Sequence, residues 1–263
     1  ITPLQRAVCR IIEHRPIQEL WAASRPPGWG RVGKEFKTGT PLVAEALGVK
    51  TAARYNAWVK DRPREVVWLA AVRTAKSLFA AATAIWSTQT CDLSILNSGE
   101  IPRYSILSLS LDNAKVVLGH LLGALNKPML EHLKVEPRSD PLLNESGADT
   151  VGSVFLRHPT GRTCEIRVIA GKRAGGSLVS RWSIGACLDE APRMVGTSDG
   201  VINYDDARRA VVSRLLPGAQ ILSLGSPFQP FGPIYDIVTE EFGKPNSERV
   251  VIRAKGPDLN PVW

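Results

Sequence analysis

Residues 70–77 place a lysine and a serine side by side, directly after an apolar run and directly before the helical stretch LFAAATAIW. A strand, a tight turn and a helix start direct backbone N–H groups and a helix dipole at one point, which is a geometry that binds phosphate. In the pattern GxxxxGK[ST], Lys76 would reach the β and γ phosphates of a nucleoside triphosphate, and the Ser77 hydroxyl would ligate Mg²⁺. The predicted nucleotide-binding residues of this segment are Ala70, Ala71, Val72, Arg73, Thr74, Ala75, Lys76 and Ser77.

Two alanines, Ala70 and Ala75, stand where the phosphate-binding pattern has glycine. Glycine serves there because the backbone approaches phosphate closely and can need a positive φ, which costs alanine roughly 1 kcal/mol. We therefore expect a loop conformation that alanine tolerates. On this segment alone, an ordinary strand-to-helix turn that carries a Lys-Ser pair is an equally good interpretation.

An acidic pair, Asp189 and Glu190, ends a second apolar run at residues 184–189. A buried parallel strand would bring Asp189 to its carboxyl edge, where a carboxylate can hold Mg²⁺ through water. Glu190 would then polarise the attacking water, while Lys76 and Mg²⁺ offset the charge that develops on the phosphoryl group. Solvated acids at a strand end are the alternative, but the two motifs together favour a nucleoside triphosphatase.

A third apolar run, residues 219–225, ends in small polar residues, with Ser226 and Pro227 following Gly225. Strand tips line the nucleotide crevice of doubly wound sheets, so Ser226 could sense the γ phosphate. A plain strand-to-turn exit explains the same residues equally well.

These motifs resemble the ATPase domain of the large terminase subunit of tailed double-stranded DNA bacteriophages. AAVRTAKS, CLDEAPRM, the LGSP strand tip and the ending VVIRAKGPDLNPVW carry the resemblance, which covers roughly residues 64–263. It implies a P-loop NTPase fold of the additional-strand, catalytic-glutamate type that hydrolyses ATP with Mg²⁺ to move viral DNA into a procapsid. It also implies a homo-oligomeric ring on the viral portal, a small terminase subunit as partner, and the cytoplasm of the bacterial host as location.

The resemblance assigns roles to single residues. Lys76 and Ser77 would bind phosphate and Mg²⁺, Asp189 would support the metal, and Glu190 would be the catalytic base. Arg73 matches an arginine that such loops often carry, and its guanidinium could stabilise γ-phosphate charge or simply pair with a neighbouring acid. The further expectations are coupling of hydrolysis to movement by Gly225, Ser226 and Pro227, adenine recognition by Gln5 or Gln18, and an arginine acting in trans, Arg173 or Arg181.

The elements that must position these residues follow from the pattern of apolar runs. Near-continuous runs at 66–71, 104–110, 184–189, 219–225 and 250–254 are typical of strands buried on both faces, and helical stretches between them predict parallel crossovers. Residues 151–170 read as an antiparallel hairpin around Pro159, Thr160 and Gly161. The predicted fold is therefore α/β, with a mainly parallel central sheet flanked by helices.

The N-terminal third has a different sequence pattern, which predicts short helices and a loop. Thr2 and Pro3 are cap and first turn of an amphipathic helix, Thr40 and Pro41 are those of a short helix ending near Gly48, and another helix covers residues 51–59. Residues 24–41 read as a Pro- and Gly-rich loop. The predicted domains are a helical lid segment over 1–63, an ATPase core over 64–255, and from 256 to 263 the start of a linker toward a nuclease domain that this chain lacks.

Composition excludes several classes of protein. The 263 residues are 44% hydrophobic and 22% charged, which is ordinary globular usage, and no run is long and apolar enough to be a membrane span. The dispersed Cys9, Cys91, Cys164 and Cys187 indicate reduced thiols and no metal cage. The net charge of +8 suits a polyanionic partner, and its excess lies in the first 65 residues.

Two other functions fit the same residues. One is a different P-loop nucleic-acid translocase or helicase, which normally needs a second motor domain or further arginine motifs. The other is a nucleotide-binding scaffold without turnover, which the alanines at 70 and 75 allow. Because the chain begins at Ile1 without methionine and carries few acids after Glu248, we expect a fragment that contains the motor without nuclease activity.

Overall fold

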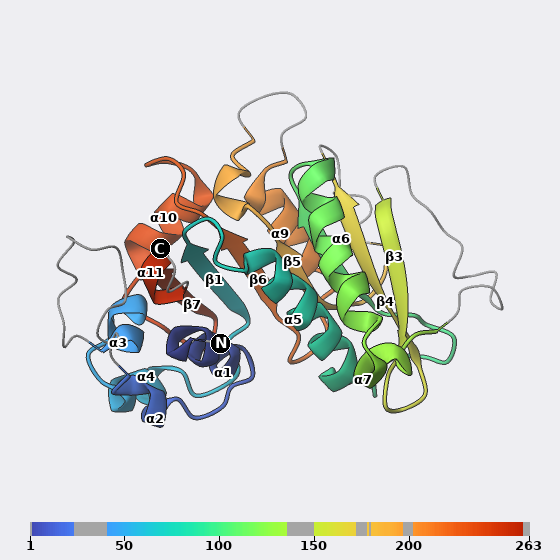
Figure 1. Ribbon diagram of the computed structural model, residues 1–263, viewed down its shortest axis with the longest axis horizontal. Coiled ribbons are helices and arrows are strands. Elements are labelled where there is room, and N and C mark those ends of the chain that lie inside the picture. The colour runs from blue at the N-terminus through green and yellow to red at the C-terminus, as the bar shows by residue number, and fades with distance from the viewer. Residues whose placement is uncertain are drawn as a thin grey trace. The chain divides into compact units, whose positions relative to one another are not determined.

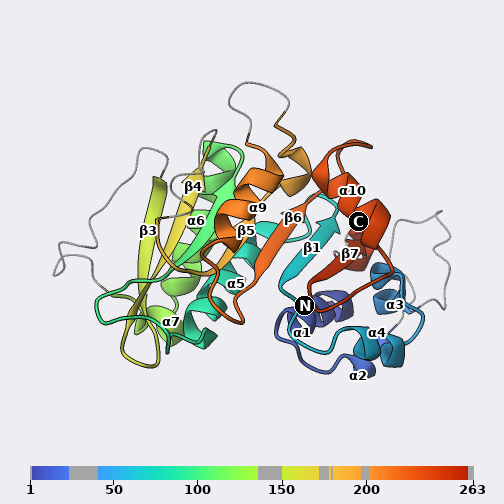
Figure 2. The same cartoon turned by 180° about the vertical axis from the view of Figure 1, so that it is seen from behind.

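The computed structural model describes residues 2–23, 41–135, 150–171, 178, 180–196 and 202–259. The chain divides into two compact units, one formed by Ile1–Thr74 with Leu224–Trp263 and the other by Ala75–Ser223. Figures 1 and 2 show the elements of both units from opposite sides. The division into a helical lid segment, an ATPase core and the start of a linker stays a prediction.

The first unit combines the N-terminal helices with two parallel strands. Its elements are α1 (Pro3–Ile12), α2 (Gln18–Trp21), α3 (Leu42–Leu47), α4 (Ala52–Trp58), β1 (Glu65–Ala70), α10 (Pro233–Glu241), β7 (Arg249–Ala254) and α11 (Gly256–Leu259). β1 pairs with β7 in parallel, with Val67 opposite Val251. All six residues of β1 are buried, which confirms the strand predicted from its continuous apolar run.

The first helix forms as its sequence predicts. The Thr2 side chain accepts a hydrogen bond from the Gln5 backbone, the Gln5 side chain accepts one from the Thr2 backbone, and Pro3 occupies the first turn. One apolar stripe of α1 is buried, formed by Leu4, Ala7, Val8, Ile11 and Ile12. The buried stripe fixes this helix against the rest of its unit.

The short helix predicted to begin at Thr40 and Pro41 is α3, and it differs slightly from its prediction. α3 begins at Leu42, with Pro41 at the N-cap and no side-chain hydrogen bond to the cap. The predicted cap residue Thr40 lies outside the described residues, as does the rest of the predicted loop from residue 24 to residue 40. The helix ends as expected at Gly48, whose φ of 67° is left-handed. A Cβ on Gly48 would come within 2.9 Å of the Gly243 Cα, so close backbone packing also requires glycine.

The second unit contains five strands in the order β3-β4-β2-β5-β6. Its elements are α5 (Lys76–Thr90), β2 (Arg103–Ser108), α6 (Leu111–Leu125), α7 (Pro128–Glu131), β3 (Thr150–Arg157), β4 (Thr163–Ala170), β5 (Ser183–Leu188), the 3₁₀ helix η3 (Ala191–Arg193), α9 (Tyr204–Val212) and β6 (Ile221–Gly225), whose last two residues belong to the first unit. β2 pairs in parallel with β4 and β5, and β5 pairs in parallel with β6. β3 and β4 form the predicted antiparallel hairpin.

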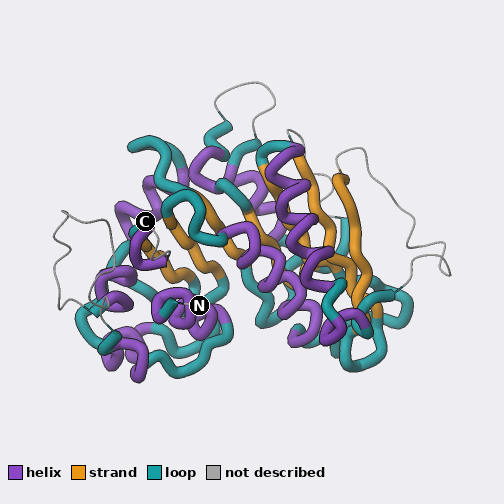
Figure 3. The backbone as a smooth tube through the Cα atoms, in the orientation of Figure 1, coloured by secondary structure: helices purple, strands orange, loops and turns teal. Residues whose placement is uncertain are grey.

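Helices cover both faces of these five strands. α5 and α6 lie on one face, and α9 lies on the other, as the two opposite views show (Figures 1 and 2). Figure 3 shows the same layering of helices and strands in the backbone trace. The predicted α/β class and the mainly parallel strands are confirmed.

Burial of the parallel strands determines which polar groups reach their ends. Every residue of β2 and of β5 is buried. The polar residues at the carboxyl ends, Ser108 and Asp189, are therefore held in a nearly dry environment at the same edge of the sheet. Arg103 and Ser183 occupy the amino ends of the same two strands.

No disulfide joins Cys9, Cys91, Cys164 and Cys187, which all lie among the described residues. Among the described residues, none of the helices has the length and apolar character needed to cross a bilayer.

Candidate active site

The predicted phosphate loop links the end of β1 to the start of α5. The Thr74 hydroxyl donates a hydrogen bond of 2.7 Å to the Ala71 carbonyl, and Thr74 is buried. Arg73 and Ala75 have φ values of 59° and 65°, in the left-handed region. From the sequence we expect a loop conformation that alanine tolerates. This expectation is wrong at Ala75, which has the positive φ for which the phosphate-binding pattern uses glycine.

Left-handed backbone conformations concentrate at the predicted site. Among the described residues, the non-glycine residues with positive φ are His14, Arg73, Ala75 and Glu190. Three of these four belong to the phosphate loop or the acidic pair. Such conformations cost of order 1–3 kcal/mol each and cluster at active sites, where the surrounding structure must hold them.

Lys76 is the first residue of α5, and its side chain is 7% exposed. Burial lowers the pKa of the Lys76 ammonium from its ordinary value, while the charges of Glu190 and Asp189 act in the opposite direction. The ammonium and both carboxylates therefore interact within the unit Ala75–Ser223. Lys76 and the acidic pair are thus close enough in this unit for their charges to act on one another, although they are far apart in the sequence.

Asp189 follows β5 directly and is 4% exposed. Burial, with the neighbouring charge of Glu190, raises the pKa of Asp189 to about 6, although Lys76 and a hydrogen bond from Ser108 act against this. The Ser108 hydroxyl donates to Asp189 Oδ2 at 3.2 Å. The carboxylate thus lacks full compensation by the positive charges around it.

Glu190 has a φ of 57° and begins the turn into η3. Its Oε2 atom is buried and has no hydrogen-bond partner among the described residues. Arg193 Nε lies 3.7 Å from the same oxygen, which is an ion-pair distance without a hydrogen bond. One oxygen of Glu190 therefore remains able to accept a proton or a hydrogen bond.

The donor set at this edge fits Mg²⁺. Magnesium prefers oxygen ligands, usually one or two carboxylates and hydroxyls together with water and phosphate oxygens. Asp189 offers a buried carboxylate with a raised pKa, and Ser77 sits in the first turn of α5. A divalent cation nearby would favour the charged form of Asp189, so the residues present suit this ion.

A cavity of about 530 Å³ lies in the first unit and has the phosphate-loop residue Ala71 in its wall. Its other walls include Phe242, Arg253 and Asp258. The Arg253 guanidinium lies over the Phe242 ring, 4.9 Å from its centre. A cationic plane stacked on an aromatic ring can hold a further flat, polarisable group.

Gln5, a predicted adenine reader, uses its amide within the fold. Its Oε1 accepts a hydrogen bond from the Thr2 backbone, and its Nε2 donates to the Leu259 carbonyl at 3.2 Å. Leu259 directly follows Asp258, so Gln5 is bonded next to one wall of the cavity. The alternative, Gln18, is exposed at the start of α2.

The remaining predicted residues are the three coupling residues and the two candidate arginines that would act in trans. Gly225 ends β6, and Ser226 and Pro227 follow it in the first unit. Arg181 lies just before β5, with its Nη1 3.9 Å from Glu165 Oε2. Arg173 lies outside the described residues.

Several residues of the site were not predicted from the sequence. Ser108 and Arg193 bear on the acidic pair, and Phe242 and Arg253 line the cavity. The sequence could have indicated Ser108, because it is a small polar residue at the end of an apolar run. It could not have indicated the cavity residues, because tertiary packing alone brings them together.

The solved structures that share this fold include large terminases of bacteriophages. The large terminase of a thermophilic bacteriophage, solved in complex with ADP, matches with a TM-score of 0.51 and 10% identity over 76% of this chain and 42% of that one. The large terminase ATPase domain of Thermus phage P74-26 gives 0.50 and 14% over 83% and 86%. The HK97 bacteriophage large terminase gives 0.52 and 14% over 84% and 40%.

These matches define the class of the fold. The chain has the α/β architecture of these terminase structures. It spans about two fifths of the length of the ADP-bound terminase and of the HK97 protein, but most of the P74-26 domain. No protein-family model and no curated protein sequence matches the chain.

Proposed function

We propose that this chain is the ATP-hydrolysing motor domain of a machine that moves double-stranded viral DNA into a procapsid. The observation that carries the proposal is the meeting of Lys76 with Asp189 and Glu190 at the carboxyl ends of buried parallel strands. Ligands of open α/β sheets bind at this edge. The shared fold with terminase ATPase domains supports the same function.

The start of α5 would hold the phosphates. Its first-turn N–H groups and the Lys76 ammonium offer positive charge to the β and γ phosphates. Ser77, and Asp189 through water, would hold Mg²⁺, which when bound neutralises charge on the phosphate oxygens. Arg73, exposed in the loop, would add a guanidinium to the γ phosphate.

Glu190 would act as the general base. In this step the oxygen of a water molecule forms a bond to the γ phosphorus, the bond from that phosphorus to the β-γ bridging oxygen breaks, and Glu190 accepts the proton of the water. The buried Oε2 atom, which has no hydrogen-bond partner among the described residues, is suited to take that proton. Lys76 offsets the charge that develops on the leaving ADP.

The cavity of the first unit has walls that suit a nucleobase. Its volume of about 530 Å³ lies in the range of small-molecule sites, and Phe242 with Arg253 offers a flat surface for a base. Gln5, bonded next to the Asp258 wall, stays the candidate for reading adenine. The terminase of the thermophilic bacteriophage binds ADP, which supports a nucleotide of this type.

The coupling and assembly roles extend this proposal. Gly225, Ser226 and Pro227 would transmit the loss of the γ phosphate, and one of the two candidate arginines, Arg173 or Arg181, would act in trans on a neighbouring subunit. The partners would be double-stranded DNA, a homo-oligomeric ring on a portal and a small terminase subunit, in the cytoplasm of a bacterial host. The net charge of +8 supports a polyanionic partner.

ATP turnover by the purified chain, with and without duplex DNA, tests the proposal. Lys76→Ala should lower kcat/KM at least about 100-fold, because it removes a charge from the transferred phosphoryl group. Lys115→Ala, which removes an exposed lysine from α6, is the matched control and should turn over like the wild type. A scaffold would bind ATP without turnover, and a helicase would separate the strands of a duplex during turnover; either result contradicts the proposal.

A further inference from the structure

A second charged region lies at the amino ends of β2, β4 and β5. Glu165 is fully buried and accepts hydrogen bonds from Arg103 Nε and Arg167 Nε at 2.7 Å each, and from the Ser153 hydroxyl at 2.8 Å. Arg181 Nη1 lies 3.9 Å from the same carboxylate. One negative charge therefore faces three guanidinium groups, which leaves the cluster with an excess of positive charge.

A cavity of about 340 Å³ opens beside this cluster. Its walls come from residues 99–101 before β2, from residues 180–182 before β5, and from Arg214. The Ser180 hydroxyl accepts a hydrogen bond of 2.8 Å from Arg103 Nη1, which joins the cavity wall to the buried cluster. The excess charge is thus held directly behind a solvent-accessible hollow.

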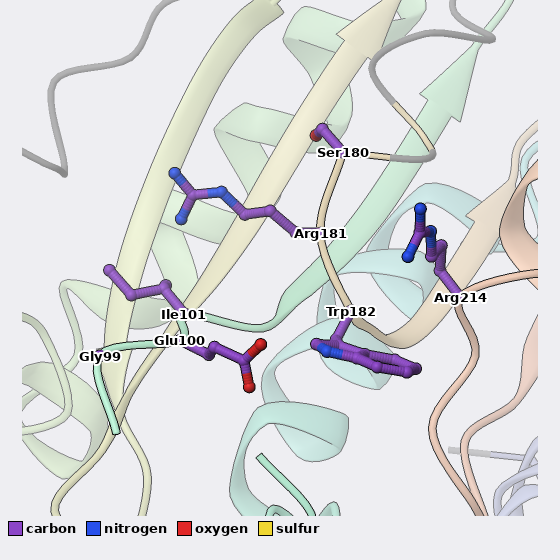
Figure 4. Close-up of a pocket in the computed structure, with 7 residues that line it drawn as sticks. All are labelled: Gly99, Glu100, Ile101, Ser180, Arg181, Trp182 and Arg214. Atoms are coloured by element: carbon purple, nitrogen blue, oxygen red, sulfur yellow. The ribbon is translucent and has the colours of Figure 1, made fainter. Parts of the chain in front are cut away.

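The side chains in the cavity are those that bind phosphate esters. Figure 4 shows Arg214 above the Trp182 indole and the Glu100 carboxylate pointing toward that ring, while the Arg181 guanidinium points away from it. Arg214 is exposed, and Trp182 is 37% exposed. Guanidinium groups bind phosphate oxygens through paired hydrogen bonds, and an exposed indole beside them offers a surface for a sugar or a base.

This cavity lies at the opposite ends of the strands from Lys76 and Asp189. β2 and β5 each have six residues, which at about 3.3 Å per residue separate the two edges by roughly 20 Å. A nucleotide bound at the carboxyl edge of this unit cannot reach the cavity in the same unit. The cavity therefore needs a different phosphate.

Glu100 helps to define that phosphate. Counting Arg214 and Glu100, four guanidinium groups face two carboxylates around the cluster and cavity. Glu100 weakens the attraction for a single free anion, so tight retention of orthophosphate is not expected. A polymer with a phosphate at every residue gains instead from many weak contacts and can still move past them.

We propose that the cavity formed by Glu100, Ser180, Arg181, Trp182 and Arg214 is a nucleic-acid phosphate site, which grips the DNA backbone at the sheet edge opposite the ATP site. The inference rests on the proposed function, since it assigns a place to the polymer that the motor moves. It involves no recognition of sequence, because the contacts are to the backbone.

Binding of a fluorescein-labelled 20-bp duplex, measured by anisotropy without nucleotide or Mg²⁺ across a series of NaCl concentrations, tests the site. Arg214→Ala should weaken binding about 3- to 10-fold and reduce the slope of log K against log salt by about 0.9, the loss of one phosphate contact. Glu100→Gln should tighten binding, because it removes a negative charge. Lys115→Ala, in the first turns of α6 after the carboxyl end of β2, removes the same charge as Arg214→Ala and should leave the slope unchanged.

The outcomes separate the two proposals. If the wild type binds the duplex but Arg214→Ala and Glu100→Gln both behave like Lys115→Ala, the phosphate site is wrong and the motor is unaffected. Competition by orthophosphate at the same concentration as DNA phosphate would assign the cavity to a free ion and overturn the nucleic-acid assignment. A wild type that turns over ATP but binds no duplex would contradict the DNA-moving function itself.

Discussion

The two ends of the parallel strands in the unit Ala75–Ser223 both bury charged groups, but they balance them in opposite ways. At the amino ends, Glu165 is saturated with hydrogen bonds, and although burial acts to raise its pKa, Arg103, Arg167 and Ser153 hold that pKa below its usual range. At the carboxyl ends, burial and Glu190 raise the pKa of Asp189 to about 6. The hydrogen bonds and positive charges around Glu165 outweigh its burial, whereas those around Asp189 do not.

The backbone follows the same division. The left-handed Ala75 and Glu190 lie at the carboxyl ends, whereas none of the described residues of the amino-end cluster has a positive φ, and Arg103 lies directly opposite Glu165 in the register of β2 and β4. Strain and uncompensated charge are tolerated where a ligand can relieve them. The comparison therefore predicts that mutations at the two ends have opposite effects on stability.

The largest expected effect concerns chemistry at the carboxyl ends. Glu190→Gln keeps the shape of the side chain but cannot accept a proton, so turnover of ATP should fall about 100- to 10,000-fold while ATP binding persists. Single-turnover hydrolysis and nucleotide binding, measured on the same preparation, check this. Glu131→Gln, an exposed acid in α7, is the matched control. Loss of ATP binding together with turnover would assign Glu190 to binding instead.

The next effect concerns stability at the amino ends. Glu165→Gln removes the one carboxylate that faces Arg103, Arg167 and Arg181, and should lower the free energy of unfolding by about 3–5 kcal/mol, the usual cost of breaking a buried ion pair. Urea denaturation at pH 7 measures it. A change as small as that of the exposed Glu131→Gln would show that the cluster is not the compensated region proposed above.

The pH dependence of the same variant sharpens the test. Because the folded pKa of Glu165 lies below its ordinary value of 4.5, its stabilisation is present above that value and is lost as pH falls through the folded pKa. The unfolding free energies of wild type and Glu165→Gln should therefore converge as the pH falls below 4.5. Curves that stay parallel to pH 3 would contradict this.

Whether the sequence predicts the charged groups at each end of the strands depends on how far apart the contributing residues lie along the chain. Lys76, Ser77, Asp189 and Glu190 stand in short motifs at the ends of apolar runs, so their edge of the sheet is predictable. The pairing of Arg103 with Glu165 is not, because it depends on β4 lying beside β2 in the strand order. Sheet order is a tertiary property, and an apolar run with an arginine at its start does not reveal its neighbour.

A smaller effect of opposite sign is expected at Asp189. Its folded pKa of about 6 lies above the ordinary value of 3.8, so the stability it contributes at low pH is lost as pH rises through about 6. Without divalent cations at pH 7.5, Asp189→Asn should therefore raise the free energy of unfolding by about 1–3 kcal/mol, since each pKa unit corresponds to about 1.4 kcal/mol. The gain should vanish near pH 3.

Urea denaturation in EDTA measures this change, with Asp61→Asn as a control at an exposed loop acid. Destabilisation by Asp189→Asn at pH 7.5 would mean that the carboxylate is already compensated in the folded chain. The contrast between the two strand ends would then be lost.

The smallest effect concerns the backbone of the phosphate loop. Ala75→Gly releases the left-handed strain of about 1–2 kcal/mol, and the greater freedom of glycine in the unfolded chain takes back about 0.5–1 kcal/mol, so stability should stay level or rise by up to about 1.5 kcal/mol. The same substitution at exposed Ala82 in the middle of α5 should cost about 1 kcal/mol, because that residue is right-handed and helical. Urea denaturation of the two variants side by side gives the difference. Equal losses would show that the left-handed conformation of Ala75 carries no strain.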